Sequence, residues 1–175
     1  MRFLLETLTP ADRLSIITFN SYPTRLCGLK RVSPENLVQL NEIINSIHAG
    51  GGTNIDSGLE LGLKIMRDRK QANEVSSIFL LSDGQDRGAE GTFRERLKKE
   101  ENKNLGVYSI HSFGFGGDHD EELMRSICEM KDGAFYFIKE LATLDEAFCN
   151  ALGGIISLAA NQMTIKINNI AQGLA

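Results

Sequence analysis

The feature that most constrains the fold is an alternation of two kinds of apolar segment along the chain. Short, nearly continuous apolar runs alternate with longer segments whose apolar residues recur every three or four positions. The first kind is typical of strands buried on both faces of a parallel sheet, and the second is typical of amphipathic helices. The alternation predicts a doubly wound α/β domain, with helices on both faces of a mostly parallel sheet. The predicted strands are Leu14–Phe19, Val75–Leu81, Gly106–Phe115 and Ala134–Ile138, with Thr24–Leu29 as a weaker edge strand.

The helical segments carry recognisable start signals. Ser33 precedes Pro34, which combines a favoured N-cap residue with proline at the first helical position. Thr143 and Glu146 match a capping box at the start of the last helix. The apolar stripes that we expect to face the core are Leu37, Leu40, Ile44 and Ile47; Ile55, Leu59, Leu63 and Met66; Leu123, Ile127 and Met130; and Leu144, Phe148, Leu152, Ile156 and Ala159.

The two ends differ from the body of the predicted domain. Residues Met1–Leu8 have the pattern of the last turns of a helix that stops at Thr9-Pro10, and no strand precedes them. At the other end, Met163–Asn168 alternates apolar and polar residues, as a half-exposed antiparallel strand does. We therefore predict one domain over residues 1–160 and the start of a following segment over residues 161–175.

Composition argues against two classes of partner. The 175-residue chain is 42% apolar and 24% charged, which is the composition of a globular protein with a full core. Its net charge of −4 lacks the basic character of a nucleic-acid-binding face. No apolar stretch approaches the roughly 20 residues that span a bilayer, and Glu6 interrupts the first apolar run before it reaches the length of a leader peptide. We expect neither nucleic acid nor membrane as a partner.

The cysteines indicate a compartment. Cys27, Cys128 and Cys149 are odd in number and lack the spacing of a metal motif. Such a pattern is typical of free thiols in a reducing environment. We expect buried free thiols and a cytoplasmic protein.

Two polar loops contain the candidate site residues. The stretch AGGGTNIDSG, residues 49–58, places three glycines before Thr53, and the stretch SDGQD places Asp83 directly after a buried apolar strand. Ligands of open α/β sheets bind at the carboxyl ends of the strands, where such loops meet. A carboxylate after a hydrophobic strand is also costly unless a cation or hydrogen bonds meet it. Thr53 and Asp83 are therefore the strongest candidates.

Several chemistries lack their characteristic residues. A P-loop carries a lysine after its glycines, but this stretch has Thr53-Asn54, and it follows a helix rather than the first strand, which disfavours nucleotide binding. No G-x-S-x-G motif supports nucleophilic hydrolysis. The histidines and cysteines show no zinc-ligand spacing.

An oxygen-ligated cation fits these residues better. Thr53 offers a hydroxyl and Asp83 a carboxylate, both of which Mg²⁺ accepts as ligands. The alternative is structural: Thr53 would cap the helix that begins near Ile55, and Asp83 would accept hydrogen bonds from loop amides. The spacing alone does not decide between these two interpretations.

At these residues the chain resembles a von Willebrand factor type A (vWA) domain. The stretches LTPADRLSIITFN, AGGGTNIDSGLELGL and FLLSDGQD occur in the order and at the separations that this family uses. The stretches IHSFGFGGDHDEELMRSICEMKDGAFYFI and AFCNALGGIISLAANQMTIKI are similar to the vWA domains of eukaryotic RING-finger proteins that resemble ubiquitin ligases. Inter-α-trypsin inhibitor heavy chains are more distant relatives. The resemblance covers residues 1 to about 160 and implies a Rossmann-like fold.

The resemblance implies a metal ion-dependent adhesion site (MIDAS). In such a site three loops hold Mg²⁺ or Mn²⁺, and an acidic side chain of a protein partner completes the coordination. Thr53 matches the threonine of the second loop and Asp83 the aspartate of the third. The first loop, an Asp-x-Ser-x-Ser motif, has no match, which implies weak metal binding by this chain. The residues of the two loops that would support the site are Gly51, Gly52, Asn54, Ser82 and Gly84.

The resemblance also has a consequence for the sheet. It places the family's first strand and first loop upstream of Met1, and that strand would lie between Leu14–Phe19 and Val75–Leu81. Its place should be empty unless Met163–Asn168 fills it. Three functions stay open: a non-enzymatic, metal-dependent protein-interaction module, a metal-independent scaffold domain of a larger protein such as a RING-type ubiquitin ligase, and a nucleotide-dependent enzyme.

Overall fold

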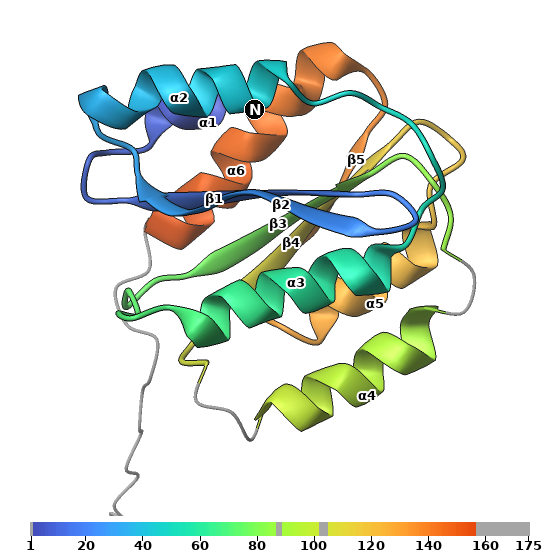
Figure 1. The fold of residues 1–175 in the computed structure, drawn as a ribbon. Helices are drawn as coiled ribbons and strands as arrows, with labels where there is room; N and C mark the ends of the chain where they lie inside the picture. The colour runs from blue at the N-terminus through green and yellow to red at the C-terminus, as the bar shows by residue number, and fades with distance from the viewer. Residues whose placement is uncertain (1, 87–88, 102–104, 157–175) are drawn as a thin grey trace, which may run out of the picture.

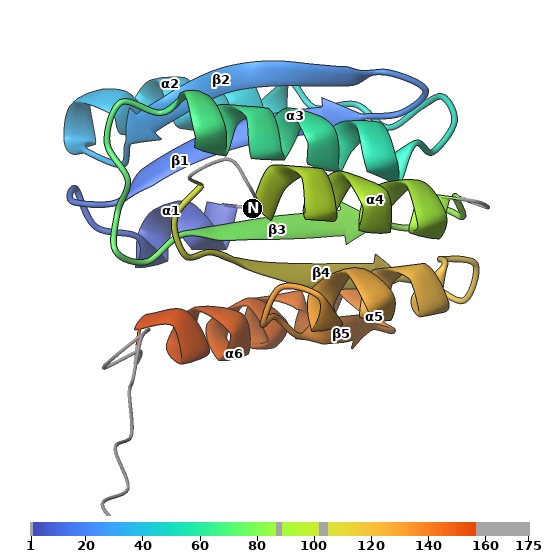
Figure 2. The same cartoon turned by 90° about the horizontal axis from the view of Figure 1, so that it is seen from below.

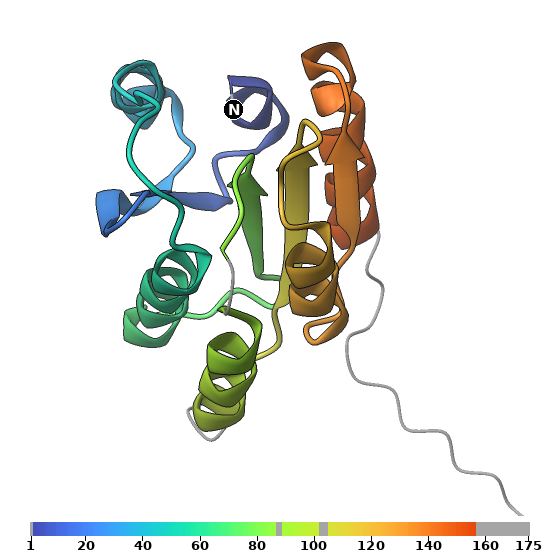
Figure 3. The same cartoon turned by 90° about the vertical axis from the view of Figure 1, so that its right-hand side faces the viewer.

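The computed structural model describes residues 2–86, 89–101 and 105–156. Helices cover both faces of the strands, as the alternation predicts: α3, α4 and α5 lie on one face, and α1, α2 and α6 on the other (Figure 3). Within the described ranges, no helix has the length and apolar character needed to cross a membrane. The helices are α1 (Arg2–Thr7), α2 (Pro34–Asn45), α3 (Ile55–Asp68), α4 (Ala89–Glu101), α5 (Glu121–Glu129) and α6 (Leu144–Ile156), with a short 3₁₀ turn at Leu141–Thr143. The strands are β1 (Arg13–Phe19), β2 (Pro23–Arg31), β3 (Ser77–Ser82), β4 (Ser109–Phe115) and β5 (Phe135–Ile138).

The strands form two sheets. β3, β4 and β5 pair in parallel with β4 in the middle, whereas β1 and β2 form an antiparallel pair. Ser82, the last residue of β3, lies beside Gly114 near the end of β4. The parallel strands therefore end at a common edge, on the right of Figure 1, and the loops that follow them meet there.

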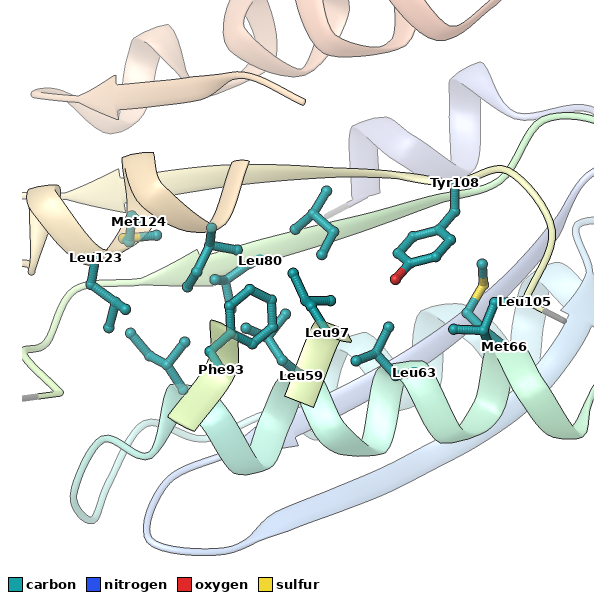
Figure 4. Packing of buried hydrophobic residues seen from close by; sticks show 13 residues of the cluster. Leu59, Leu63, Met66, Leu80, Phe93, Leu97, Leu105, Tyr108, Leu123 and Met124 are labelled. Carbon is teal, nitrogen blue, oxygen red and sulfur yellow. The ribbon is translucent and has the colours of Figure 1, made fainter. Parts of the chain in front are cut away.

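The main hydrophobic core lies between the three-stranded sheet and helices α3, α4 and α5 (Figure 4). Phe93 of α4 and Ile110 of β4 are fully buried in it. The apolar stripe predicted after the glycines is confirmed, since its four residues are between 0% and 8% exposed: Ile55, Leu59, Leu63 and Met66. Burial of such surface is the dominant favourable term in folding.

Two further apolar clusters occupy the opposite face. One packs α6 and Leu4 of α1 against the parallel sheet, with the rings of Phe113 and Phe148 4.7 Å apart between centroids. The other joins Leu5 of α1 to Ile16 of β1 and Leu40 of α2. The short helix α1 thus contributes neighbouring residues to the clusters of both sheets.

Hydrogen bonding is interrupted between β1 and β3. Among the described residues, β1 pairs with β2 alone and β3 with β4 alone, so each has one edge without a strand partner. Across the molecule the strands follow the order β2, β1, β3, β4, β5 (Figure 2). The interruption lies where the sequence resemblance places an absent strand. The segment Met163–Asn168 lies outside the described residues.

Helix α3 connects the two sheets. At Gly62, an added Cβ would lie 3.5 Å from the side chain of Ile78 in β3 and 3.9 Å from that of Ile17 in β1. One turn earlier, a Cβ at Gly58 would approach the ring of Phe19 to 2.8 Å. Glycine at Gly58 lets the helix backbone pack directly on Phe19, although glycine inside a helix costs roughly 1 kcal/mol relative to alanine.

Most predicted elements are confirmed, with ends shifted by a few residues. The strand predicted at Gly106–Phe115 starts at Ser109, because Gly106 adopts a positive φ of 70° that is incompatible with a strand. Ile47 was predicted to face the core, but it lies beyond the end of α2 and is 36% exposed, so that prediction is wrong. Ala159 lies outside the described residues.

Two predictions at single residues need correction. Thr143 precedes α6 as expected, but its hydroxyl donates to the carbonyl of Glu140 at 2.8 Å and so stabilises the turn before the helix. Cys27 and Cys128 are buried free thiols, whereas Cys149 is exposed on α6. Burial raises the pKa of the Cys128 thiol, which keeps it protonated at neutral pH.

The interrupted hydrogen bonding predicts uneven amide protection. In β4 both edges are paired, whereas about half of the amides of β1 and β3 point away from their single partner strand. We expect these amides to exchange on the order of tenfold faster than those of β4 in native-state hydrogen exchange. Equal protection of every amide in β1, β3 and β4 would show that something covers the open edges.

Candidate functional site

The loops at the carboxyl edge of the strands contact one another. The Thr53 side chain lies against Gly84, the residue after Asp83, so closely that a Cβ at Gly84 would collide with the threonine hydroxyl. The amide of Asp120, in the loop after β4, donates to the carbonyl of Gly84 at 3.3 Å. The structure therefore brings the Thr53 loop, the Asp83 loop and the loop after β4 together at one edge.

The turn after β3 is set by its own backbone and by Ser82. Ser82 is 7% exposed, and its hydroxyl accepts a hydrogen bond from the Gly84 amide at 3.3 Å. The Asp83 side chain between them is exposed. The backbone of Asp83 is thus held in place by β3 and by the turn that follows it. Its carboxylate faces solvent at the carboxyl edge of the parallel sheet.

The cap of α3 is made by residues other than Thr53. Asn54 Oδ1 accepts from the Ser57 amide at 2.9 Å, as an N-cap side chain does. Asp86, from the loop after β3, accepts from the Ile55 amide at 2.6 Å and from the Asp56 amide at 3.5 Å. The interpretation of Thr53 as the helix cap is therefore wrong, and the Thr53 hydroxyl is directed at Gly84.

Asp86 links the two loops that carry the candidate residues. Its carboxylate comes three residues after Asp83 and satisfies the first amide of the helix that follows Thr53. A negative charge at a helix N-terminus also interacts favourably with the helix dipole. Sequence reasoning missed this role, because a side chain that caps a helix from a different loop leaves no local pattern.

An ion pair attaches α4 to the first turn of α3. Arg96 donates to Asp56 through Nε at 3.1 Å and Nη2 at 2.6 Å, and its Nη1 lies 2.8 Å from Glu60. The side chains of Arg96 and Asp56 are 22% and 16% exposed, so water screens this pair only in part. The hydrogen bond to Asp56 raises the pKa of Arg96. Both oxygens of the Asp56 carboxylate therefore bind Arg96 of α4.

The glycines before Thr53 make room for the turn between β1 and β2. Gly51 has a φ of +88°, and a Cβ there would lie 2.9 Å from Asn20 Nδ2. A Cβ at Gly52 would lie 3.2 Å from the hydroxyl of Ser21. Asn20 Nδ2 also donates to the carbonyl of Gly50 at 3.3 Å. The side chains of Asn20 and Ser21 therefore pack against the glycine stretch.

The two buried histidines serve packing. His119 Nδ1 lies 2.7 Å from the carbonyl oxygen of Gly116, and its ring stacks on Phe137 at 5.2 Å between centroids. His111 Nδ1 accepts from the Ala134 amide at 3.2 Å, and burial lowers the pKa of His111. Within the described part of the chain, no group of three or more His, Cys, Asp or Glu side chains could hold a metal ion.

Comparison with known proteins identifies the family. Residues 1–137, well over half of the chain, match the von Willebrand factor type A domain. The chain belongs to this family. One relative of this chain is the E3 ubiquitin-protein ligase WAV3 of Arabidopsis thaliana, which is 27% identical to it over 168 residues. The match covers 95% of this chain and 21% of the ligase, so the chain spans about a fifth of that relative's length.

Solved structures show the same fold. A von Willebrand factor type A protein from Catenulispora acidiphila superposes with a TM-score of 0.74 at 20% identity, covering 85% of this chain and 35% of that one. Proximal thread matrix protein 1 of the mussel byssus, whose MIDAS motif is occupied by zinc, superposes with a TM-score of 0.62 at 21% identity. The match covers 83% of this chain and 38% of the mussel protein. The chain therefore has the Rossmann-like fold of a vWA domain.

Removing the Asp86 carboxylate tests the cap that joins the two loops. Asp86→Ala leaves the Ile55 amide without its acceptor and should lower the free energy of unfolding by about 1 kcal/mol. Asp86→Asn keeps an acceptor oxygen and should lose less. Asp68→Ala, which removes a 58% exposed carboxylate at the other end of α3, is the control and should change stability by less than about 0.5 kcal/mol. Equal urea midpoints for Asp86→Ala and Asp68→Ala would contradict the cross-loop cap.

Proposed function

We propose that the chain is a non-enzymatic protein-interaction module in which Thr53 and Asp83 help to hold a divalent cation that an acidic side chain of a protein partner also contacts. The observation that carries this proposal is the contact of the Thr53 side chain with the turn Asp83–Gly84. It puts one hydroxyl and one exposed carboxylate at the edge where vWA domains carry their MIDAS. Gly51, Gly52, Asn54, Ser82 and Gly84 would support the two loops.

The donor set favours Mg²⁺ or Mn²⁺ over softer metals. Both donors are oxygen atoms, which hard cations prefer, whereas zinc sites usually include histidine or cysteine. Two protein ligands leave most of the coordination sphere to water, and Mg²⁺ dehydrates reluctantly. The zinc in the mussel protein's MIDAS is a property of that protein. We therefore propose weak binding of Mg²⁺ or Mn²⁺ by this chain, with the partner's carboxylate as a further ligand.

A second candidate is a metal-independent scaffold domain of a larger protein such as a RING-type ubiquitin ligase. It is favoured by the match to WAV3, which extends along 95% of this chain. The nucleotide-dependent enzyme has less support, because Gly51 and Gly52 lie against Asn20 and Ser21 of the same chain and no lysine follows them. We also propose the boundary near residue 160 and a cytoplasmic location, the latter supported by the free thiols Cys27 and Cys128.

Weak metal binding has a measurable consequence for thermal stability. A site with a dissociation constant near 10 mM gains about 0.4 kcal/mol at 10 mM metal, since stabilisation follows the logarithm of one plus ligand over dissociation constant. For a domain of this size that corresponds to roughly 1 °C in Tm. We expect MgCl₂ to raise Tm by no more than this amount, relative to an equal ionic strength of NaCl. A rise of several degrees that is lost in Asp83→Ala but still seen in Asp68→Ala would show that the site at Thr53 and Asp83 binds metal more tightly than we propose.

Asp83→Ala should reduce partner binding far more than it reduces stability. The Asp83 side chain is exposed, so its removal should change the free energy of unfolding by about 1 kcal/mol or less. Loss of a desolvated charge contact in a complex costs on the order of 2–5 kcal/mol of binding free energy. Urea denaturation and a titration of the partner, each with and without EDTA, separate the two effects. Unchanged binding by the variant, together with no effect of EDTA, would replace the metal bridge with the scaffold function.

A further inference from the structure

The turn between β1 and β2, residues Asn20–Tyr22, is held rigidly at the same edge as the candidate site. The Tyr22 amide donates to Asn20 Oδ1 at 3.0 Å, and the Asn20 amide donates to the Tyr22 carbonyl at 3.3 Å. Asn20 Nδ2 then attaches the turn to the glycine loop through Gly50 at 3.3 Å. Asn20 therefore fixes both backbone groups of Tyr22 and the position of the whole turn.

The Tyr22 side chain is presented to solvent by this fixed backbone. It is 80% exposed, more than the other large apolar side chains that are exposed in the described residues, among them Val38 at 67% on α2 and Phe137 at 51% on β5. Isolated exposed apolar residues are common on protein surfaces. Tyr22 differs because the backbone groups that carry it are hydrogen-bonded on both sides, so an interaction with its ring would require little further ordering of the chain.

The turn that carries Tyr22 lies against the glycine loop that leads to Thr53. Ser21 lies against Gly52, where a Cβ would approach the serine hydroxyl to 3.2 Å. Tyr22 is the residue after Ser21, and Thr53 is the residue after Gly52. The turn between β1 and β2 therefore lies close to the loop that carries Thr53, on the right of Figure 1.

We propose that Tyr22 is an anchor residue for the protein partner of this edge. The partner segment carries an acidic side chain for the site at Thr53 and Asp83, and beside it an apolar side chain that packs on the Tyr22 ring. Tyrosine is suited to this role because a rigid ring buries a large apolar area and its hydroxyl still reaches water or a polar group. The inference rests on the proposed function and adds the second chemical feature that the partner must have.

The same inference assigns a purpose to the glycines before Thr53. Gly51 has a φ of +88°, which residues other than glycine rarely adopt. A Cβ at this position would lie 2.9–3.0 Å from three atoms of the Asn20 side chain. Gly51→Ala should therefore displace Asn20 and with it the Asn20–Tyr22 turn. The variant tests whether the placement of Tyr22, as well as its presence, supports binding.

A random 12-residue peptide library displayed on phage and selected on the wild-type chain in 10 mM MgCl₂ provides the probe. We expect enriched peptides to contain an acidic residue close to an apolar one. Tyr22→Ala should weaken their binding by about tenfold or more, the range of an interface anchor, and Tyr22→Phe should restore most of it. Val38→Ala, which removes a comparably exposed side chain from α2, is the control and should bind as the wild type does. Thermal unfolding of each variant establishes that it is folded.

The outcomes separate this inference from the metal proposal. Weaker binding of Gly51→Ala to peptides that depend on Tyr22 but on neither Asp83 nor metal, in a variant that is still folded, would support the placement of Tyr22 by the glycines. Peptides that lose affinity with Asp83→Ala and EDTA but bind Tyr22→Ala within twofold of the wild type would overturn the anchor and leave the metal bridge standing. Peptides that depend on Tyr22 but on neither Asp83 nor metal would support the anchor and remove the bridge. A selection that enriches no Tyr22-dependent peptide would also overturn the anchor.

Discussion

The packing of α3 against two sheets is the interaction on which the rest of the structure depends. β1 and β3 share no hydrogen-bonded ladder, so the usual directional link between neighbouring strands is missing at that point. Hydrophobic contact supplies the link, because the buried stripe of α3 packs on the parallel sheet while Gly58 lies against Phe19 of β1. Burial alone is non-directional. The close approach at Gly58 adds a steric constraint that fixes where the helix lies, and with it the loop that carries Thr53.

Three carboxylates near Thr53 differ in what they contact. Asp86 accepts from the first amide of α3, and Asp56 is paired with Arg96 of α4, so both stabilise the position of that helix. Asp83 is exposed and follows a strand whose turn is already set by Ser82. Burial or pairing explains why the first two are acidic, but packing gives no reason for a carboxylate at Asp83. A residue whose chemistry the fold does not need is the one most free to serve binding.

The sequence predicted the fold better than the contacts within the site. Periodicity identifies strands and helices because each element buries a regular set of side chains, as Ile55, Leu59 and Leu63 do. Thr53 could be chosen because it follows a run of three glycines, and Asp83 because a carboxylate directly after an apolar strand is unusual. Asp86 and Asn20 could not, since each acts on a loop that is distant in sequence: Asp86 on the amide of Ile55, and Asn20 on the carbonyl of Gly50. Such pairings depend on how the loops meet, which no local pattern encodes.

The interruption of the sheet and the small number of oxygen ligands at the proposed cation site have one geometric origin. In a parallel sheet each strand ends at the same edge, and the loop that follows it lies between the loops of its two neighbours. The open edges of β1 and β3 face each other, so a strand that paired with both, parallel to β3, would end between the Asn20–Tyr22 turn and the turn at Asp83. Its following loop would then lie beside Thr53. The place where strand pairing is missing is therefore the place from which further oxygen ligands could reach the proposed cation site, and a segment that paired with both strands would bring its following loop to that site.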